Sequence, residues 1–324
     1  MRKGTIILLI IAAALTLIGG AIFTVGIAAG VNEGESFVDA KYQDKTYGSD
    51  DEIKAIDVKS SVAYIKLLPY DKEGYLVKCF EEKNAYHNVS VKDGVLSIEL
   101  QDTRAWYDFI SFFSKPTHVT VYIPAGHYDS LTVSSSTGDI YVQSYFTFNK
   151  ADVSCSTGDV EFLASTENAL SIKTSTGNVS LGNGSDQFTH GNVSLTTSTG
   201  NVTAKKLSLK DFTISVTTGK TNISDVTCDS LRSTGNTGNI SMSNLLVKGT
   251  LSVNRSTGDV TFDKCDAAEL YITTDTGDVR GSLLSPKIFL YDTDTGDVSL
   301  PGTTTGGKCK ITTDTGDISF SIVN

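Results

Sequence analysis

Apolar and polar residues alternate along most of the chain after residue 53, and from residue 131 the alternation recurs in short, nearly equal units. At ten regularly spaced places the sequence reads Thr-Gly followed by a polar residue, and the successive glycines of these ten units are 19 to 23 positions apart. A period this short predicts one small unit stacked on itself, so that neighbouring units share one long core. The repeat glycines are Gly138, Gly158, Gly177, Gly200, Gly219, Gly238, Gly258, Gly277, Gly296 and Gly316.

With the repeat glycine as position zero, positions −7, −5, +2 and +4 are apolar in nearly every unit, as in Leu131, Val133, Ile140 and Val142 of the first. Within a strand, a spacing of two places side chains on one face. The pattern therefore favours an all-β fold, a parallel β-solenoid of about ten coils of 19–20 residues over residues 131–324. An antiparallel array of hairpins is the alternative, but it would need an equally strict second turn in each unit.

The Thr-Gly turn follows from residue chemistry. Glycine takes a positive φ readily, and Asp or Asn beside it can bond nearby backbone groups. The residue after the glycine is Asp or Asn in nine units and Lys220 in the other. The position therefore needs a polar turn-former more than a charge, and we expect a structural role for all ten turns.

Residues 53–130 predict shorter, less regular strands. A stacked array needs a cover over its first open end, so this region is expected to be an irregular β cap. Within it, Ala105–Phe113 is rich in aromatic residues. These side chains are expected to fill the cap, or alternatively to contact the bilayer surface or a partner.

The amino terminus predicts the compartment. Residues 5–30 carry no charge over 26 positions, which is long enough for one transmembrane helix. Arg2 and Lys3 hold the stub 1–4 in the cytoplasm, so the body is expected to be extracellular on a single-pass anchor in the cell membrane. A cleaved signal peptide is the alternative. The polar residues 31–52 are expected to be a tether.

Charge and cysteine content exclude some functions. The formal net charge is −10, and an acidic body repels phosphate backbones, so no nucleic-acid partner is expected. The five cysteines are odd in number and lack metal-ligand spacing. They predict buried apolar side chains rather than a disulfide framework.

The last turns carry a second acid two positions before the glycine. Six stacked carboxylates could attract calcium, which takes oxygen ligands of this kind. We nevertheless expect structural turn residues and no cofactor, with calcium as the alternative, since Asn replaces Asp elsewhere in the array. The candidate ligands are Asp275, Asp278, Asp294, Asp297, Asp314 and Asp317.

Enzyme signatures are thin. The four histidines do not repeat, and no GxSxG, HExxH or Walker sequence is present. Parallel β-helices do include polysaccharide lyases and hydrolases, but no basic stripe faces the acids.

At the carboxyl end, Ser319–Asn324 carry apolar residues with no polar cap after them. We expect another molecule, such as a second copy, to cover this last coil.

Together, the anchor, the cap and the repeats resemble a bacterial family of membrane-anchored surface proteins called putative adhesins with β-strand repeats. The resemblance rests on Val121–Pro124, on Leu131–Val133 leading into Ser136–Asp139, and on the nine later copies. It implies a surface β-solenoid that binds a cell-wall or host glycan or a surface protein, and it brings no catalytic residues. Envelope-stress sensing or a regulatory scaffold is the first alternative, and a carbohydrate-active β-helix enzyme is the second.

Overall fold

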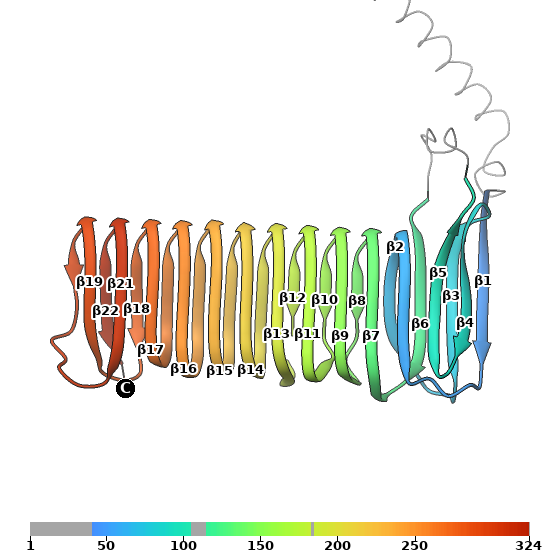
Figure 1. The fold of residues 1–324 in the computed structure, drawn as a ribbon, viewed down its shortest axis with the longest axis horizontal. Coiled ribbons are helices and arrows are strands. Elements are labelled where there is room, and N and C mark those ends of the chain that lie inside the picture. The colour runs from blue at the N-terminus through green and yellow to red at the C-terminus, as the bar shows by residue number, and fades with distance from the viewer. Residues whose placement is uncertain (1–40, 105–114, 183–184, 324) are drawn as a thin grey trace, which may run out of the picture.

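The computed structural model describes residues 41–104, 115–182 and 185–323. Over these residues the chain forms a long rod of parallel strands, closed at one end by an irregular β cap (Figure 1). The helix expected over residues 5–30 and the aromatic segment Ala105–Phe113 fall outside the described residues. In the part that is described, no helix has the length and apolar character needed to cross a membrane.

Each repeat supplies both walls of the rod. Early repeats use a separate strand for each wall, middle repeats run as one bent strand from turn to turn, and the last repeats are again divided. These strands are β7 (Gly126–Thr137), β8 (Ile140–Val142), β9 (Phe146–Thr157), β10 (Val160–Phe162), β11 (Ser165–Thr176), β12 (Val179–Leu181), β13 (Phe188–Thr199), β14 (Val202–Thr218), β15 (Thr221–Thr237), β16 (Ile240–Thr257), β17 (Val260–Thr276), β18 (Val279–Leu283), β19 (Lys287–Thr295), β20 (Val298–Ser299), β21 (Gly307–Thr315) and β22 (Ile318–Ile322).

Neighbouring coils pair in parallel and in register. Val160 lies opposite Ile140 on one side and Val179 on the other, all at position +2. This pairing confirms the parallel solenoid and excludes the hairpin array. Each middle coil bends a second time, away from the Thr-Gly turn, at one residue six positions after the repeat glycine. This residue has a φ between 49° and 55°, and the four examples are Lys206, Asp225, Asn244 and Lys264.

The core lies between the two walls and runs along the rod. Side chains at the inward position −5 are buried in this core: Val133, Val153 and Ile172 are at most 2% exposed. The five cysteines are free and buried, as predicted. Equal position in the repeat therefore means equal depth in the core.

The rod begins one coil earlier than the Thr-Gly repeats. Strand β2 (Ala55–Tyr70) pairs in parallel with β7 and β8, with Ile56 opposite Leu131 and Ile65 opposite Ile140. Ala63 occupies the turn position that glycine occupies in later coils, since its carbonyl faces Gly138. Because alanine stands where the later coils have glycine, the Thr-Gly pattern does not predict this coil.

The cap extends both walls beyond β2. On one wall, β5 (Val95–Asp102) runs parallel to β2 and pairs with antiparallel β4 (Ala85–Lys92). On the other, β6 (Thr117–Pro124) runs parallel to β2 and is followed by antiparallel β3 (Tyr75–Glu82) and β1 (Tyr42–Ser49). The expected tether therefore ends earlier than residue 52, because Tyr42–Ser49 belong to the cap.

The far end of the rod differs from the prediction. Strand β21 pairs with β17 on one side and β19 on the other, so the last coil of the sequence lies between the two preceding coils. The outermost coil in Figure 1 is β19 with β20. The carboxyl-terminal strand expected to be uncovered is instead internal, and Phe320 is only 7% exposed.

Candidate functional site

The Thr-Gly turns stack along one edge of the rod, with all ten repeat glycines at positive φ. The residue after each glycine forms a hydrogen-bonded ladder. Asp159 N–H donates to Asp139 Oδ1 at 2.8 Å, and Asn178 N–H donates to Asp159 Oδ1 at 2.7 Å. Asp and Asn exchange freely because each supplies a side-chain oxygen. Lys220 receives no such bond from the next coil, and the ladder resumes where Asp259 N–H donates to Asn239 Oδ1 at 3.1 Å.

A second ladder faces inward at position −3. The Thr197 hydroxyl donates to the Gly177 carbonyl at 3.0 Å, and Thr274 donates to Gly258 at 3.2 Å. These bonds satisfy turn carbonyls that face the core. Both ladders link successive turns through hydrogen bonds.

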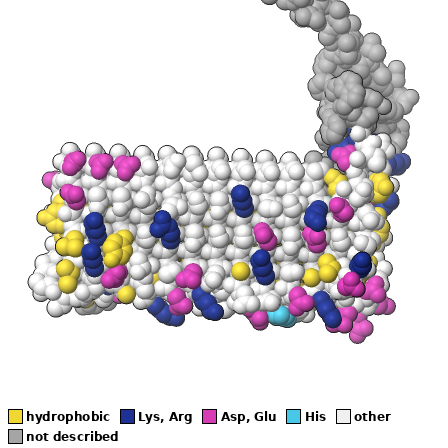
Figure 2. Space-filling view, in the orientation of Figure 1, with side chains coloured by type: hydrophobic (Ala, Val, Ile, Leu, Met, Phe, Trp, Pro, Cys, Tyr) yellow, Lys and Arg dark blue, Asp and Glu magenta, His cyan; other side chains and the backbone are white. Residues whose placement is uncertain are grey.

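The six candidate calcium ligands lie on the turn edge of the last three coils, where Figure 2 shows a row of acidic side chains. Two of them accept ladder bonds: Asp317 N–H donates to Asp278 Oδ1 at 3.0 Å, and Asp297 N–H donates to Asp317 Oδ1 at 2.8 Å. Arg280 Nη1 lies 3.1 Å from Asp278 Oδ2. Among the described residues, the six aspartates do not supply a group of three ligand atoms within 4.8 Å of one another.

The distal end of the rod carries an exposed patch that the repeat analysis missed. Ile288 and Leu290 are 43% and 47% exposed on β19, opposite Lys308 and Lys310 of β21. Lys308 Nζ lies 5.5 Å from the ring centre of Tyr271 on β17. We call these five residues the tip patch, and Figure 2 shows hydrophobic and basic side chains together at this end.

The sequence did contain a signal for the tip patch. Its residues occupy outward positions −8 and −6, which in most other coils carry small or polar side chains such as Ser130 and Thr132. Apolar residues at these outward positions predict side chains that are exposed to solvent. Large apolar side chains exposed together at a tip are typical of interaction surfaces.

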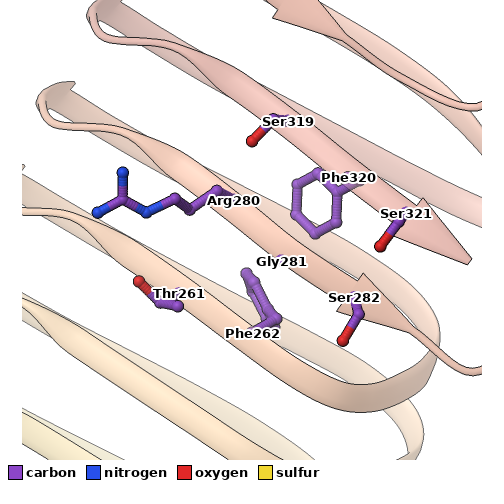
Figure 3. Close-up of a pocket in the computed structure, with 8 residues that line it drawn as sticks. All are labelled: Thr261, Phe262, Arg280, Gly281, Ser282, Ser319, Phe320 and Ser321. Carbon is purple, nitrogen blue, oxygen red and sulfur yellow. The ribbon is translucent and has the colours of Figure 1, made fainter. Parts of the chain in front are cut away.

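An open pocket of about 440 Å³ lies beside the tip, where β22 packs against β18 and β17 (Figure 3). Phe262 and Phe320 meet across Gly281, with ring centroids 5.6 Å apart. Four serine or threonine hydroxyls and Arg280 complete the lining. None of the eight lining residues is a histidine or carboxylate that could activate a hydroxyl.

The cap encloses a polar cluster from three strands. His87 Nδ1 lies 2.9 Å from Glu81 Oε2, and His87 Nε2 lies 3.0 Å from Ser60 Oγ. This order matches a catalytic triad, but Glu81 and His87 are at most 2% exposed. The sequence did not predict the cluster, because no motif links its members and the three consecutive strands β2, β3 and β4 bring them together only in the folded cap.

The same cluster includes Cys79, whose ligand atom lies within 4.8 Å of those of Glu81 and His87. These three residue types could hold a zinc ion. However, burial and the charge of Glu81 raise the pKa of Cys79 to about 12, and Glu81 Oε1 already accepts a bond from Gln43 at 3.4 Å. Ser60 occupies position −3 of the first coil, so the His87 ring contacts a hydroxyl of the same inward position that carries Thr197 and Thr274 in later coils.

Several solved structures resemble the chain. A putative adhesin from Bacteroides fragilis is 13% identical, with 87% of this chain and 97% of that chain covered and a TM-score of 0.45. A putative lipid binding protein from Parabacteroides distasonis is 14% identical at the same coverage and a TM-score of 0.45. A putative cell adhesion protein from Clostridium sporogenes is 10% identical, with 87% and 100% covered and a TM-score of 0.21.

No curated protein matches the chain. The family model described as Toastrack DUF4097 matches residues 53–187 and again residues 164–324. The two matches together cover residues 53–324, which include the whole rod and the cap apart from β1 and amount to more than half of the sequence. The chain therefore belongs to the Toastrack DUF4097 family.

Proposed function

We propose that this protein is a membrane-anchored binding scaffold of the bacterial cell surface, an adhesin in the broad sense. The 26 uncharged positions of residues 5–30 support an anchor with the amino terminus in the cytoplasm and the body outside. The described chain enters the rod at the cap, and the tip patch lies at the opposite end (Figure 1). A rigid rod of this kind would hold its tip away from the anchored end.

The tip patch carries this proposal. Lys308 and Lys310 lie beside exposed Ile288 and Leu290 on a protein whose net charge is −10. Basic side chains set among apolar ones favour a partner that is negatively charged and also offers apolar contact. An anionic glycan polymer of a cell wall or host surface has this chemistry, because acidic groups alternate with the C–H faces of its sugar rings. Binding without turnover and without a cofactor is expected.

Binding by the purified full chain tests the proposal. The probes are the anionic glycans polygalacturonate and hyaluronate, and neutral dextran. We expect the two anionic polymers to bind, and added salt to weaken the binding by screening the lysines. Lys308→Gln with Lys310→Gln should weaken binding at least about tenfold, the effect of losing roughly 1.4 kcal/mol.

The matched control is Lys205→Gln with Lys210→Gln, which removes the same charge from exposed positions in the middle of the rod. Equal loss of binding in the two double variants would reject the tip patch and leave only general charge attraction. Binding of dextran alone would reject an anionic partner. Shortened polymer after incubation would support the carbohydrate-active enzyme instead.

Self-association is a second candidate, favoured by the free edge of β19. Within the described residues β19 pairs only with β21, so its other edge offers unpaired backbone groups to a second copy. This proposal moves the expected contact from the carboxyl-terminal strand to the coil that lies outside it. Light scattering that shows only monomer at high concentration would reject it.

A further inference from the structure

Arg255 lies inside the rod, where the repeat elsewhere places small or hydroxyl-bearing side chains. It occupies the inward position −3 of its coil and is only 2% exposed. The equivalent residues include Thr174, Thr197 and Thr274. A guanidinium in this column is costly, since moving a charge from water into a protein core carries a penalty of several kcal/mol unless it is paired.

Three neighbouring positions have changed together with Arg255. Its Nη2 donates to Thr221 Oγ1 at 3.1 Å and to Ser233 Oγ at 3.0 Å. Thr221 occupies position +2 and Ser233 occupies position −5, which are aliphatic in nearly all other coils. A Cβ on Gly235 would overlap with Arg255 Nη1 and also with the backbone carbonyl of Val216. Four departures from the repeat therefore meet at one point in the core, which indicates a site adapted to the guanidinium.

The site is incomplete as the chain supplies it. Arg255 Nε and Nη1 are buried and have no hydrogen-bond partner. The buried acids among the described residues are Glu81 and Glu82, and both lie in the cap. Burial lowers the pKa of Arg255, and no nearby charge opposes this effect. Arginine nevertheless keeps its proton in proteins, so a positive charge remains without a counter-ion from the chain.

We propose that the guanidinium of Arg255 binds a small monovalent anion, chloride under physiological conditions, inside the rod. A water molecule could satisfy Nε or Nη1 but would leave the charge uncompensated, whereas an anion does both. A single arginine with two neutral hydroxyls matches one negative charge. A multiply charged anion such as phosphate or sulfate therefore does not fit this site. The anion lies within hydrogen-bond reach of Nε or Nη1 and joins the coils of Gly219, Gly238 and Gly258.

Bromide locates the anion directly. Crystals of the full chain grown with sodium bromide in place of chloride should show an anomalous peak within hydrogen-bond distance of Nε or Nη1. An ordered water at both groups, with no anomalous signal, would overturn the proposal. This experiment needs no variant and so does not depend on whether a substituted chain folds.

Thermal unfolding supplies the second test. At equal ionic strength, chloride should raise Tm by about 2–4 °C relative to gluconate, an anion too large for the core. Arg255→Met should lose this difference. So should a variant that restores regular residues at three of the four positions, with Thr221→Val, Ser233→Val and Arg255→Thr. Gly235 is kept, because a Cβ there would also overlap with the backbone carbonyl of Val216. The same chloride response in the restored variant and the wild type would overturn the proposal.

Discussion

Asp278 Oδ1 accepts a hydrogen bond from the backbone N–H of Asp317 at 3.0 Å, although 39 positions separate the two residues. Everywhere else in the ladder the bonded partner belongs to the adjacent repeat of the sequence. This bond therefore marks the inserted coil, in which β21 and β22 enter between β17–β18 and β19–β20.

The inserted order buries the inward face of the carboxyl-terminal coil. Cys309, Ile311 and Ile318 on its inward face are all 0% exposed. The coil left outside carries Tyr291 at an inward position, where it is 57% exposed. A phenol tolerates contact with water better than an aliphatic chain, so this arrangement costs less at an open end.

Cross-linking tests the order of the coils. Thr276 is the register partner of Thr315, whereas Thr295 lies one strand further out. Neighbouring strands are about 4.8 Å apart, within disulfide reach, and the next strand is not. Thr276→Cys with Thr315→Cys should therefore form a disulfide on oxidation, detected by mass spectrometry. The control pair, Thr276→Cys with Thr295→Cys, should not, and the reverse result would restore the sequential order.

Gly258→Val tests the turn. Gly258 has a φ of 141°, and a Cβ there would overlap with the carbonyl of Gly238. We expect a loss of at least about 1–3 kcal/mol from backbone strain, measured as the free energy of unfolding in urea. Gly302→Val is the matched control, because a Cβ at Gly302 meets nothing within 4 Å. An unchanged stability for the Gly258 variant would argue against this turn.

The outer ladder predicts different effects for two substitutions of Asp159. Its Oδ1 accepts the Asn178 N–H at 2.7 Å. Asp159→Asn keeps an acceptor oxygen and should change stability little. Asp159→Ala removes it and should cost about 0.5–1.5 kcal/mol in chemical denaturation. Equal effects of the two substitutions would mean that charge, not the acceptor, matters at this position.

Calcium binding at the six aspartates stays a prediction, and the geometry gives it no support. Because Asp278 and Asp317 already accept ladder bonds, we expect the same Tm in calcium and in a chelator. Asp275→Asn with Asp294→Asn and Asp314→Asn is the comparison variant. A rise in Tm with calcium that this variant lacks would establish the site.

His190 should make stability depend on pH. Burial lowers its pKa from 6.5 to about 4. Below pH 6.5 His190 binds a proton in the unfolded chain, whereas in the folded chain it stays neutral until about pH 4. The contribution of His190 to the free energy of unfolding is therefore complete above pH 6.5 and is lost as the pH falls from 6.5 to about 4. The loss should reach about 3 kcal/mol, at 1.36 kcal/mol per unit. His190→Gln should lack this slope, and equal slopes in urea unfolding at several pH values would contradict the assignment.

The repeat columns predicted much of the fold. Inward apolar residues, the glycine turn and the parallel stack follow from position in the repeat, because local geometry places equal positions at equal depth. The first coil was missed at Ala63, although Ile56, Val58, Ile65 and Leu67 fit the columns. The cap cluster was not foreseen because Ser60, Glu81 and His87 meet only when three strands converge.

From its residues alone, this chain reveals that it stacks coils and which side chains face inward. The residues alone do not determine the order of the last coils. Every coil carries the same pattern of inward positions, so it can pair equally well with any other. Three-dimensional packing settles that order: Gly281 leaves room for Phe320 against Phe262, and Gly306 and Gly307 let the chain pass close to neighbouring backbone. The tip patch exists because this long-range packing places β19, rather than the last strand, at the open end.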